Sequence, residues 1–407
     1  MSKRALSNPF IDEYMRYTEN IEAPSAFNLW ASISTLASTL QRRTWVAFEQ
    51  FGVTFYPSLY VVLTAPPGVC RKGTVIRVSE DLLHKVDGVH ILANDITREK
   101  MLRDMAKAMT RTELEDEVYS HASSTCIAEE FSTLLGIKDI AMLATLTALW
   151  NCDPLYRYHT KTQGNDTLSN VALNILAGTT PDWIASSLPQ EALGGGFTSR
   201  IVFVCEAGSD KIAGLTDDVP PLDPALGEAL SHDLQHIFNT MKGRMSWTKE
   251  AGDWYSEWYR QFRGGDNNVG DSRFQHYFAR KPTMVWKVAM CISASESDDM
   301  VIEQHHLVAA EAVLSQLEPK MPIAFGGLGR SDLAHVQGRV QEYINAKPGI
   351  TERDLFGLVM MDLRGRDEFI MVIANLIYAR QVESKTYGDE RKFYPLGVVA
   401  EVGELST

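Results

Sequence analysis

Short runs of mainly apolar residues recur along the first half of the chain, separated by segments with helical spacing. The runs have the length and composition of buried strands and cover residues 59–64, 89–92, 125–128, 171–177 and 201–205. Segments between them predict helices over 74–86, 97–109 and 136–150, with Thr97 as the N-cap of the second. Strands that alternate with helices in this way indicate an α/β fold with a mainly parallel sheet.

Helical spacing dominates the flanking regions. Residues 9–42 predict helices broken near Pro24, and residues 224–318 are mostly helical, with an aromatic stripe that we expect to be buried: Trp254, Tyr255, Trp258, Tyr259 and Phe262. Residues 331–396 predict three helices, the second capped by Thr351, and a terminal hairpin, which is typical of a winged helix. The predicted division is an N-terminal helical segment (1–42), a core (43–207), a helical lid or extension (208–320) and a winged-helix domain (331–397).

Charge and composition narrow the classes of function. The 407 residues include 39 Lys and Arg against 52 Asp and Glu, a net charge of −13, which argues against a protein that coats nucleic acid over its whole surface. Five scattered cysteines without a CxxC pair argue against a disulfide framework and a structural zinc site, and we expect the His305-His306 pair at the surface rather than at a metal. Because no signal-like or membrane-length apolar segment is present, we expect a soluble, cytoplasmic protein with no membrane contact.

The run at 59–64 leads through a turn into a helix, and the turn supplies groups that can bind phosphates. In a P-loop, backbone N–H groups and the helix dipole receive the anion, a lysine bridges the β- and γ-phosphate oxygens, and a hydroxyl group binds Mg²⁺. Lys72 and Thr74 fit the last two roles, although Gly73 separates them and other residues stand at both glycine positions of the motif. Placing Arg71 in the lysine position leaves the same glycines missing, and a surface turn with unrelated basic residues is the alternative. The predicted nucleotide-binding residues of the turn are Pro67, Gly68, Val69, Cys70, Arg71, Lys72, Gly73 and Thr74.

Carboxylates and hydroxyl groups follow two other predicted strands. A P-loop ATPase needs a carboxylate at the tip of a second strand to hold Mg²⁺, and often another that polarises the attacking water. Glu129 would hold the metal and Glu130 would be the general base, whereas a pair of acids that starts a helix is the alternative. Thr179 would sense the γ-phosphate, and a threonine N-cap before Pro181 explains the same segment equally well.

Two arginines are candidates for contact with nucleotide from further along the chain. Arg200 follows a glycine-rich stretch and begins the run at 201–205, which suits an arginine finger that reaches the nucleotide of a neighbouring subunit. A loop arginine in an ion pair is the alternative. Arg280 opens a helix of the predicted lid and would sense nucleotide there, or would lie on a solvated helix start.

The predicted winged helix does not have a basic composition. Residues 331–396 hold nine Lys and Arg against ten Asp and Glu. DNA recognition usually needs a basic face, so contact with DNA and contact with a partner protein both remain open for this domain. Residues around its third helix and hairpin could still form such a face: Arg364, Arg366, Arg380, Lys385, Arg391 and Lys392.

Taken together, these motifs resemble a family of phage and prophage P-loop proteins described as a primase/helicase-like domain of unknown function, related to RecA-type and hexameric helicase ATPases. The likeness covers roughly residues 8–320. It rests on P-P-G-x-x-R-K-G-T within 59–74, N-D-I-T at 94–97, E-E-F-S at 129–132, G-T-T-P at 178–181, G-F-T-S-R at 196–200 and the helix at Arg280.

The resemblance implies a RecA/AAA+-like P-loop NTPase core that binds ATP and Mg²⁺ and hydrolyses ATP in a ring on DNA. By motif position it assigns Lys72 and Thr74 to phosphate and Mg²⁺, Glu129 and Glu130 to hydrolysis, Thr179 to sensing and Arg200 to the finger. No primase catalytic region or zinc module is evident in the sequence, so we do not expect primer synthesis.

The hypothesis from the sequence is therefore an ATP-dependent DNA motor, a phage replicative helicase or helicase loader. We expect it to act in the host cytoplasm as a hexamer-like ring, with single-stranded DNA in the pore and a replication protein bound through the winged helix. The first alternative is a nucleotide-binding initiator or regulator of DNA replication with little hydrolysis. The second is a non-enzymatic assembly protein with a degenerate P-loop.

Overall fold

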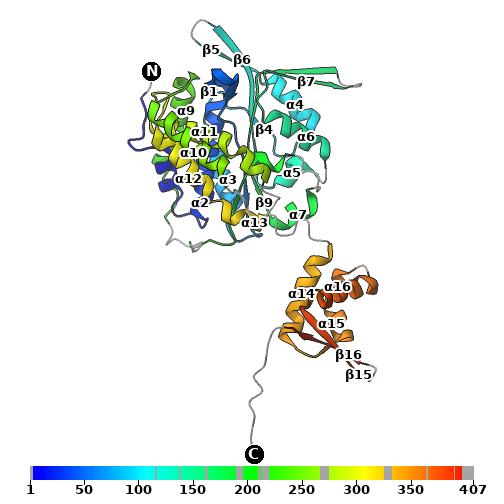
Figure 1. Cartoon of the computed structure of the whole chain (residues 1–407). Coiled ribbons are helices and arrows are strands. Elements are labelled where there is room, and N and C mark those ends of the chain that lie inside the picture. The colour runs from blue at the N-terminus through cyan, green and yellow to red at the C-terminus, as the bar shows by residue number, and fades with distance from the viewer. Residues whose placement is uncertain are drawn as a thin grey trace, which may run out of the picture. The chain divides into compact units, whose positions relative to one another are not determined.

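The computed structural model divides the chain into two compact units, residues 1–326 and residues 327–407, each with its own hydrophobic core (Figure 1). The residues predicted as an N-terminal segment and as a lid thus belong to the same unit as the predicted core. The structure describes residues 3–114, 117–136, 139–160, 164–188, 196–209, 211, 220–265, 275–324, 332–363, 365–388 and 390–396.

A six-stranded sheet forms the centre of the first unit. Five of its strands are parallel, in the order β10-β3-β9-β6-β4, and β5 pairs antiparallel with β6. The expected α/β fold with a mainly parallel sheet is confirmed. The strands are β3 (Tyr60–Thr64), β4 (Ile91–Leu92), β5 (Thr110–Leu114), β6 (Glu117–Ala128), β9 (Val171–Thr179) and β10 (Ile201–Cys205).

The apolar runs of the sequence form strands because helices cover both faces of the sheet. Every residue of β3, β9 and β10 is buried. One face contacts α2 (Ser25–Leu40) and α3 (Lys72–Leu83), and the other contacts α4 (Arg98–Lys107), α5 (Phe131–Leu135) and α6 (Ile140–Leu149). Thr97 caps α4 as predicted, because its hydroxyl oxygen accepts the N–H of Lys100.

The helices that flank the sheet in sequence pack on the α2 side of it in space (Figure 1). α2 follows Pro24, where the break was predicted, and thirteen of its sixteen residues are buried. In α11, fifteen of twenty-two residues are buried. The helices of this layer are α1 (Phe10–Tyr17), α9 (Pro224–Thr240), α10 (Lys249–Gly264), α11 (Gln275–Glu296) and α12 (Gln304–Ser315).

Short strands and helices complete the first unit. β1 (Thr44–Phe48) pairs with β2 (Val53–Phe55) and β11 (Gly243–Arg244), and β12 (Ser246–Trp247) pairs with β13 (Val301–Ile302). α7 (Pro181–Ser187) follows β9, and α13 (Met321–Ala324) contacts β10. Among the described residues, no helix has both the length and the apolar composition that crossing a membrane requires.

Two hairpins project beyond the amino ends of the sheet strands, and the hydrophobic pattern did not predict them (Figure 1). One is formed by β5 and the outer half of β6, and the other by β7 (Leu155–Thr160) and β8 (Gly164–Ser169). Buried polar residues conceal the length of β6 in the sequence. His121 bonds to Ser123, with 2.9 Å between Nδ1 and Oγ, so their hydrogen-bonding groups are satisfied inside the protein.

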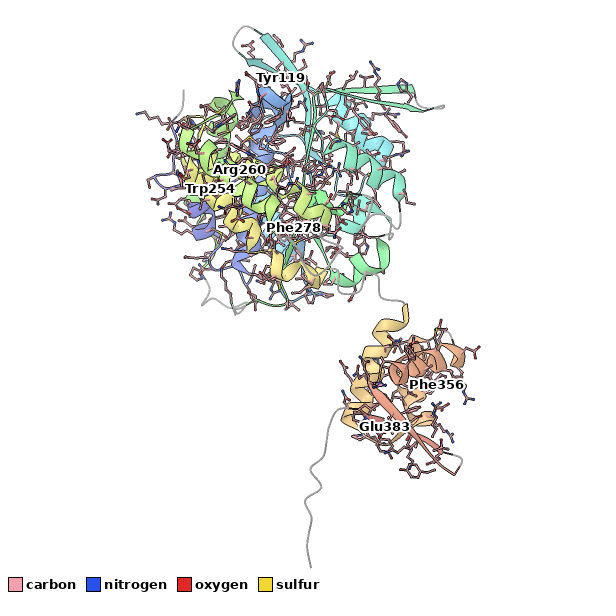
Figure 2. All side chains as sticks on the ribbon, viewed as in Figure 1. Tyr119, Trp254, Arg260, Phe278, Phe356 and Glu383 are labelled. Atoms are coloured by element: carbon pink, nitrogen blue, oxygen red, sulfur yellow. The ribbon has the colours of Figure 1, made fainter. Side chains whose placement is uncertain are left out.

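The aromatic stripe of α10 is not the buried core that its spacing suggested. Trp254, Tyr255, Trp258 and Phe262 are only partly buried, and Tyr259 is exposed. The rings stack along the helix surface instead, with 6.0 Å between the centroids of Trp254 and Trp258. Phe262 contacts Phe278 of α11 (Trp254 and Phe278 are labelled in Figure 2). The helix spacing was predicted correctly, but it could not say how much of the stripe a neighbour covers.

The second unit consists of three helices and a three-stranded antiparallel sheet in the order β14-β16-β15. The hydroxyl of Thr351 accepts the N–H of Asp354, as the predicted cap requires. Its core includes Val340, Phe369 and Phe393. The elements are α14 (Asp332–Ala346), β14 (Ile350–Thr351), α15 (Glu352–Val359), α16 (Arg366–Tyr378), β15 (Val382–Tyr387) and β16 (Glu390–Pro395).

We predict that Phe369→Ala destabilises the second unit by about 3–5 kcal/mol, since it leaves a cavity in a small core. Amide hydrogen exchange of the full chain, read by peptide, should show faster exchange across residues 332–396 and unchanged exchange in β3 and β9. Met361→Ala is the control, because that side chain is 90% exposed. Equal effects of the two substitutions would contradict the assigned core.

Candidate functional site

Three parallel strands end side by side at the carboxyl edge of the central sheet. β9 lies between β3 and β6, and the pairing is level, with Thr64 opposite Thr179 and Ala128 opposite Ala177. The segments that follow β3, β6 and β9 therefore meet at one edge. Ligands of open α/β sheets bind at this edge, outside the carboxyl ends of the strands.

The segment after β3 is a tight turn that delivers the start of α3. Gly68 and Arg71 both have left-handed backbone conformations, with φ of 73° and 46°. Such a conformation is uncommon for an arginine, and the Arg71 side chain is held by an ion pair with Glu22, 3.0 Å between Nη2 and Oε2. Lys72 is the first residue of α3, so the free N–H groups of the first helical turn open onto this loop.

The Lys72 side chain curls back over the loop that precedes it. Its Nζ atom donates to the carbonyl oxygens of Ala65 at 2.7 Å and Pro66 at 3.3 Å. Partial burial lowers the pKa of Lys72, and the nearby Glu130 carboxylate opposes that shift. The Lys72 ammonium group is therefore bound only by neutral carbonyl oxygens in this loop. An anion could replace these carbonyls as its partner.

Glu129 lies against the beginning of α3. Its Oε1 atom accepts a hydrogen bond from Nη2 of Arg77 at 2.6 Å. A Cβ atom added to Gly73 would lie 2.7 Å from Oε2 of Glu129. Gly73 departs from the P-loop pattern in the sequence. Because it has no side chain, the Glu129 carboxylate can lie close to the start of α3.

A second glycine sets the spacing between the strand ends. A Cβ atom on Gly178 of β9 would lie 2.5 Å from the backbone carbonyl oxygen of Glu129 and 3.2 Å from Cδ1 of Ile76. Backbone atoms cannot yield as a flexible side chain can. Gly178 therefore fixes how closely the Glu129-Glu130 segment approaches β9.

These segments enclose a cavity of about 320 Å³. The structure thus brings together most of the predicted loop and both predicted carboxylates. Thr180 lines the cavity where Thr179 was predicted; Thr179 is buried in β9, and the hydroxyl of Thr180 also caps α7 by accepting the N–H of Trp183. Val69 and Thr74 are exposed and are not among the lining residues. The cavity is lined by Pro67, Gly68, Cys70, Arg71, Lys72, Gly73, Glu129, Glu130 and Thr180.

Arg200 and Arg280 lie away from this cavity. Arg200 immediately precedes β10, which runs parallel to β3, so it lies at the amino edge of the sheet, opposite Lys72. It is 8% exposed and donates to the carbonyl oxygen of Gly196 at 2.7 Å. Both guanidinium groups stand 5.4 Å from the ring centroid of Trp150. Burial, followed by repulsion from Arg280, lowers the pKa of Arg200.

Most of the predicted contact cations of the second unit pair with carboxylates of the same unit. Arg366 and Arg391 approach Glu352 at 3.2 and 3.8 Å. Lys385 pairs with Glu383 at 2.9 Å, and Lys392 with Glu390 at 3.6 Å. Arg380 is exposed, and Arg364 lies outside the described residues. This local pairing reduces the positive charge available to DNA.

The two adjacent histidines differ in burial, and both contact Glu296. His305 is exposed, as expected, whereas His306 is buried. Their Nε2 atoms lie 2.8 and 3.1 Å from Oε2 of Glu296, so the three residues have the proximity of a metal site. However, Nδ1 of His306 accepts the backbone N–H of Glu303, which places the proton of the neutral ring on Nε2. That proton is directed at Glu296, and the arrangement satisfies the ring without a metal.

No protein-family model matches this chain, and no curated protein matches it.

We predict that Gly178→Ala lowers the free energy of unfolding by about 1–3 kcal/mol, because the added methyl group meets the Glu129 carbonyl. Thermal unfolding followed by circular dichroism would measure the shift. Gly208→Ala is the matched control, since nothing lies within 4 Å of its added Cβ. If both variants unfold at the wild-type temperature, the close approach of β9 to Glu129 is not as described.

Proposed function

We propose that the cavity at the carboxyl edge of the sheet binds ATP and Mg²⁺, and that the protein is an ATP-dependent motor on DNA. The observation that carries the proposal is the convergence of Lys72, the start of α3 and the Glu129-Glu130 pair on one cavity of about 320 Å³. The lysine, the first turn of α3 and the two carboxylates all line this one cavity. A phosphate chain neutralised by Mg²⁺ needs both kinds of group.

The residues present fit this ligand. The N–H groups at the start of α3 would receive phosphate oxygens, and Nζ of Lys72 would exchange the Ala65 and Pro66 carbonyls for them. Glu129 would hold Mg²⁺. Thr74 lies in the first turn of α3 but does not line the cavity, so this turn would have to shift before the Thr74 hydroxyl could bind Mg²⁺. Bound Mg²⁺ would neutralise charge on the phosphates. Glu130 would accept a proton from the attacking water, and Thr180, which lines the cavity where Thr179 was predicted, would lie next to the terminal phosphate.

The position of Arg200 supports assembly into a ring. It lies at the sheet edge opposite its own Lys72, so it cannot reach the nucleotide of its own subunit. An arginine finger supplied in trans acts on the nucleotide of a neighbour. Arg200 is 8% exposed and donates to the Gly196 carbonyl oxygen, so its side chain would have to turn outward to reach a neighbour in a ring. Arg280 shares the Trp150 ring with Arg200 and would act beside it.

We predict that Lys72→Ala lowers the affinity for a fluorescent ATP analogue at least tenfold, because it removes a charge-assisted contact with phosphate. Glu130→Gln should keep that affinity and lower the ATPase rate by about 100-fold or more, as expected when a general base is lost. Both are measured with and without single-stranded DNA, with the oligomer mass determined in the same buffer. Lys249→Ala is the control, since that residue is exposed on α10.

The outcome separates the motor from its alternatives. Wild-type binding without DNA-stimulated hydrolysis would favour the initiator or regulatory protein with little turnover. Absence of nucleotide binding by the wild type would refute the proposal and leave a non-enzymatic assembly protein with a degenerate P-loop. The resemblance to phage and prophage P-loop proteins supports the motor, and it implies that the protein would act in the cytoplasm of a host.

The second unit has the elements of a winged helix, three helices and a terminal hairpin, and we assign it that role. Its surface favours contact with a partner protein. Met361 is 90% exposed, and Ile370 and Met371 of α16 are each about half exposed, at 51% and 54%. These exposed apolar side chains, together with cations that are mostly paired, favour contact with a partner protein over contact with DNA.

We predict that deleting residues 331–407 leaves the affinity for single-stranded DNA within about twofold and leaves its salt dependence unchanged, because the removed segment offers little unpaired positive charge. Fluorescence anisotropy over a series of salt concentrations measures both quantities. A clear loss of affinity together with a shallower salt slope would instead assign the second unit to DNA contact.

A further inference from the structure

A second cavity lies at the opposite end of the sheet from Lys72. It has a volume of about 410 Å³ and is formed by the β5–β6 hairpin, by Arg43 just before β1 and by the end of α9. Val118 of this hairpin and Ala128, next to Glu129, are separated by roughly 30 Å along β6. The lining residues are Arg43, Thr110, Arg111, Thr112, Glu113, Val118, Phe238 and Lys242.

Arg43 brings a buried positive charge to this cavity. The residue is 1% exposed, and its guanidinium stands 3.6 Å from the ring centroid of Phe238. It donates to two neutral carbonyls, Phe238 at 2.6 Å and Thr39 at 3.1 Å, while its Nε atom has no partner among the described residues. Burial without an anion is costly for a cation, and burial lowers the pKa of Arg43 to about 9.

The neighbouring groups do not supply the missing anion. Arg42, 2% exposed, donates to the hydroxyl of Tyr119 at 2.7 Å and to the carbonyl of Val171 at 3.0 Å (Tyr119 is labelled in Figure 2). In the part of the chain that the structure describes, neither Arg42 nor Arg43 has a carboxylate in an ion pair. Burial and then the two arginines lower the pKa of His121 to about 3, so that ring stays neutral.

The rim adds further positive charge. Arg111 and Lys242 are exposed at the cavity, and Glu113 is the one carboxylate among the lining residues that the structure describes. Counted over those described residues, three cations and one acid line the cavity, in a chain whose net charge is −13. Positive charge concentrated in a concave site attracts anions far more strongly than the same charge spread over a surface.

We propose that the Arg43 cavity binds a phosphate group. The unused N–H donor and the uncompensated charge of Arg43 suit a phosphate better than a neutral ligand, and Arg111 and Lys242 supply the further cations that its second charge requires. If the proposed function holds, on which this identification of the source rests, the phosphate belongs to the backbone of single-stranded DNA. The same chemistry would accept a small phosphate ester, and the experiment distinguishes the two sources.

The first arm measures DNA. In the full chain, Arg111→Glu with Lys242→Glu reverses two exposed charges and leaves the buried Arg43 in place. We expect at least tenfold weaker binding of a labelled oligothymidine, and a salt slope reduced by about 1.4, since each lost phosphate contact on a single strand contributes about 0.7. Lys85→Glu with Lys249→Glu is the charge-matched control, because both lysines are exposed and neither lines the cavity.

The second arm measures a small phosphate. Pyrophosphate is added to protein that carries Lys72→Ala, so that the site at the carboxyl edge does not contribute, and the rise in unfolding temperature is compared with and without the rim reversal. Loss of this rise with unchanged DNA binding assigns the cavity to a small phosphate ester. If the reversal matches the control in both arms, the proposal is overturned.

Two further measurements keep the result interpretable. Binding of the ATP analogue to the rim variant tests the Lys72 site separately, so failure of the phosphate cavity and failure of the proposed function can be told apart. Arg43→Gln should reproduce the loss seen with the rim variant. If Arg43→Gln instead unfolds the protein, the result with the Arg111→Glu and Lys242→Glu variant still decides whether the cavity binds phosphate.

Discussion

The insertion of β9 between β3 and β6 is the constraint on which the candidate site depends. It brings three strand ends to one edge, and the level register of Thr64, Thr179 and Ala177 aligns the segments that follow them. Gly178 then lets the backbone of Glu129 come close to β9. A Cβ atom at this position would lie only 2.5 Å from the Glu129 carbonyl oxygen, so a residue with a side chain would not fit. Without this arrangement the lysine and the carboxylates would be separate surface features. With it, they line one cavity that holds both cations and carboxylates.

Charge is divided between the two ends of the sheet. The carboxyl edge presents Glu129 and Glu130 beside Lys72 and Arg71. The amino edge instead collects buried cations that contact carbonyls and aromatic rings rather than carboxylates, among them Arg43, Arg200 and Lys287. Burying a cation without a carboxylate partner costs free energy. This acidic chain has more carboxylates than cations, so a shortage of carboxylates does not explain the missing ion pairs. The division suits a protein that binds anions at both ends of one domain, even though its net charge is −13.

Sequence reasoning predicted the buried strands and most of the site, and it failed where burial depends on a partner. The strands β3, β9 and β10 were found because helices on both faces make them continuously apolar. The outer half of β6 was missed because its polar residues bond to one another. The aromatic stripe of α10 was expected in the core because its residues recur with helical spacing. That spacing shows that the rings share one face of the helix, but it does not show whether another element covers this face. Thr180 was overlooked in favour of Thr179 because the sequence does not show at which residue the strand ends. It therefore could not say which of the two neighbouring threonines faces the cavity.

The sequence by itself determined the order of the elements, the α/β class and the candidate chemistry of the loop after β3, since these depend on local spacing and residue type. Only the tertiary structure decided which strands are neighbours, and hence that Lys72 meets Glu129 while Arg200 lies at the other edge. Only the tertiary structure revealed the Arg43 cavity, whose lining comes from three segments far apart in the chain. Strand order and cavities arise from contacts between distant residues, which no local pattern encodes.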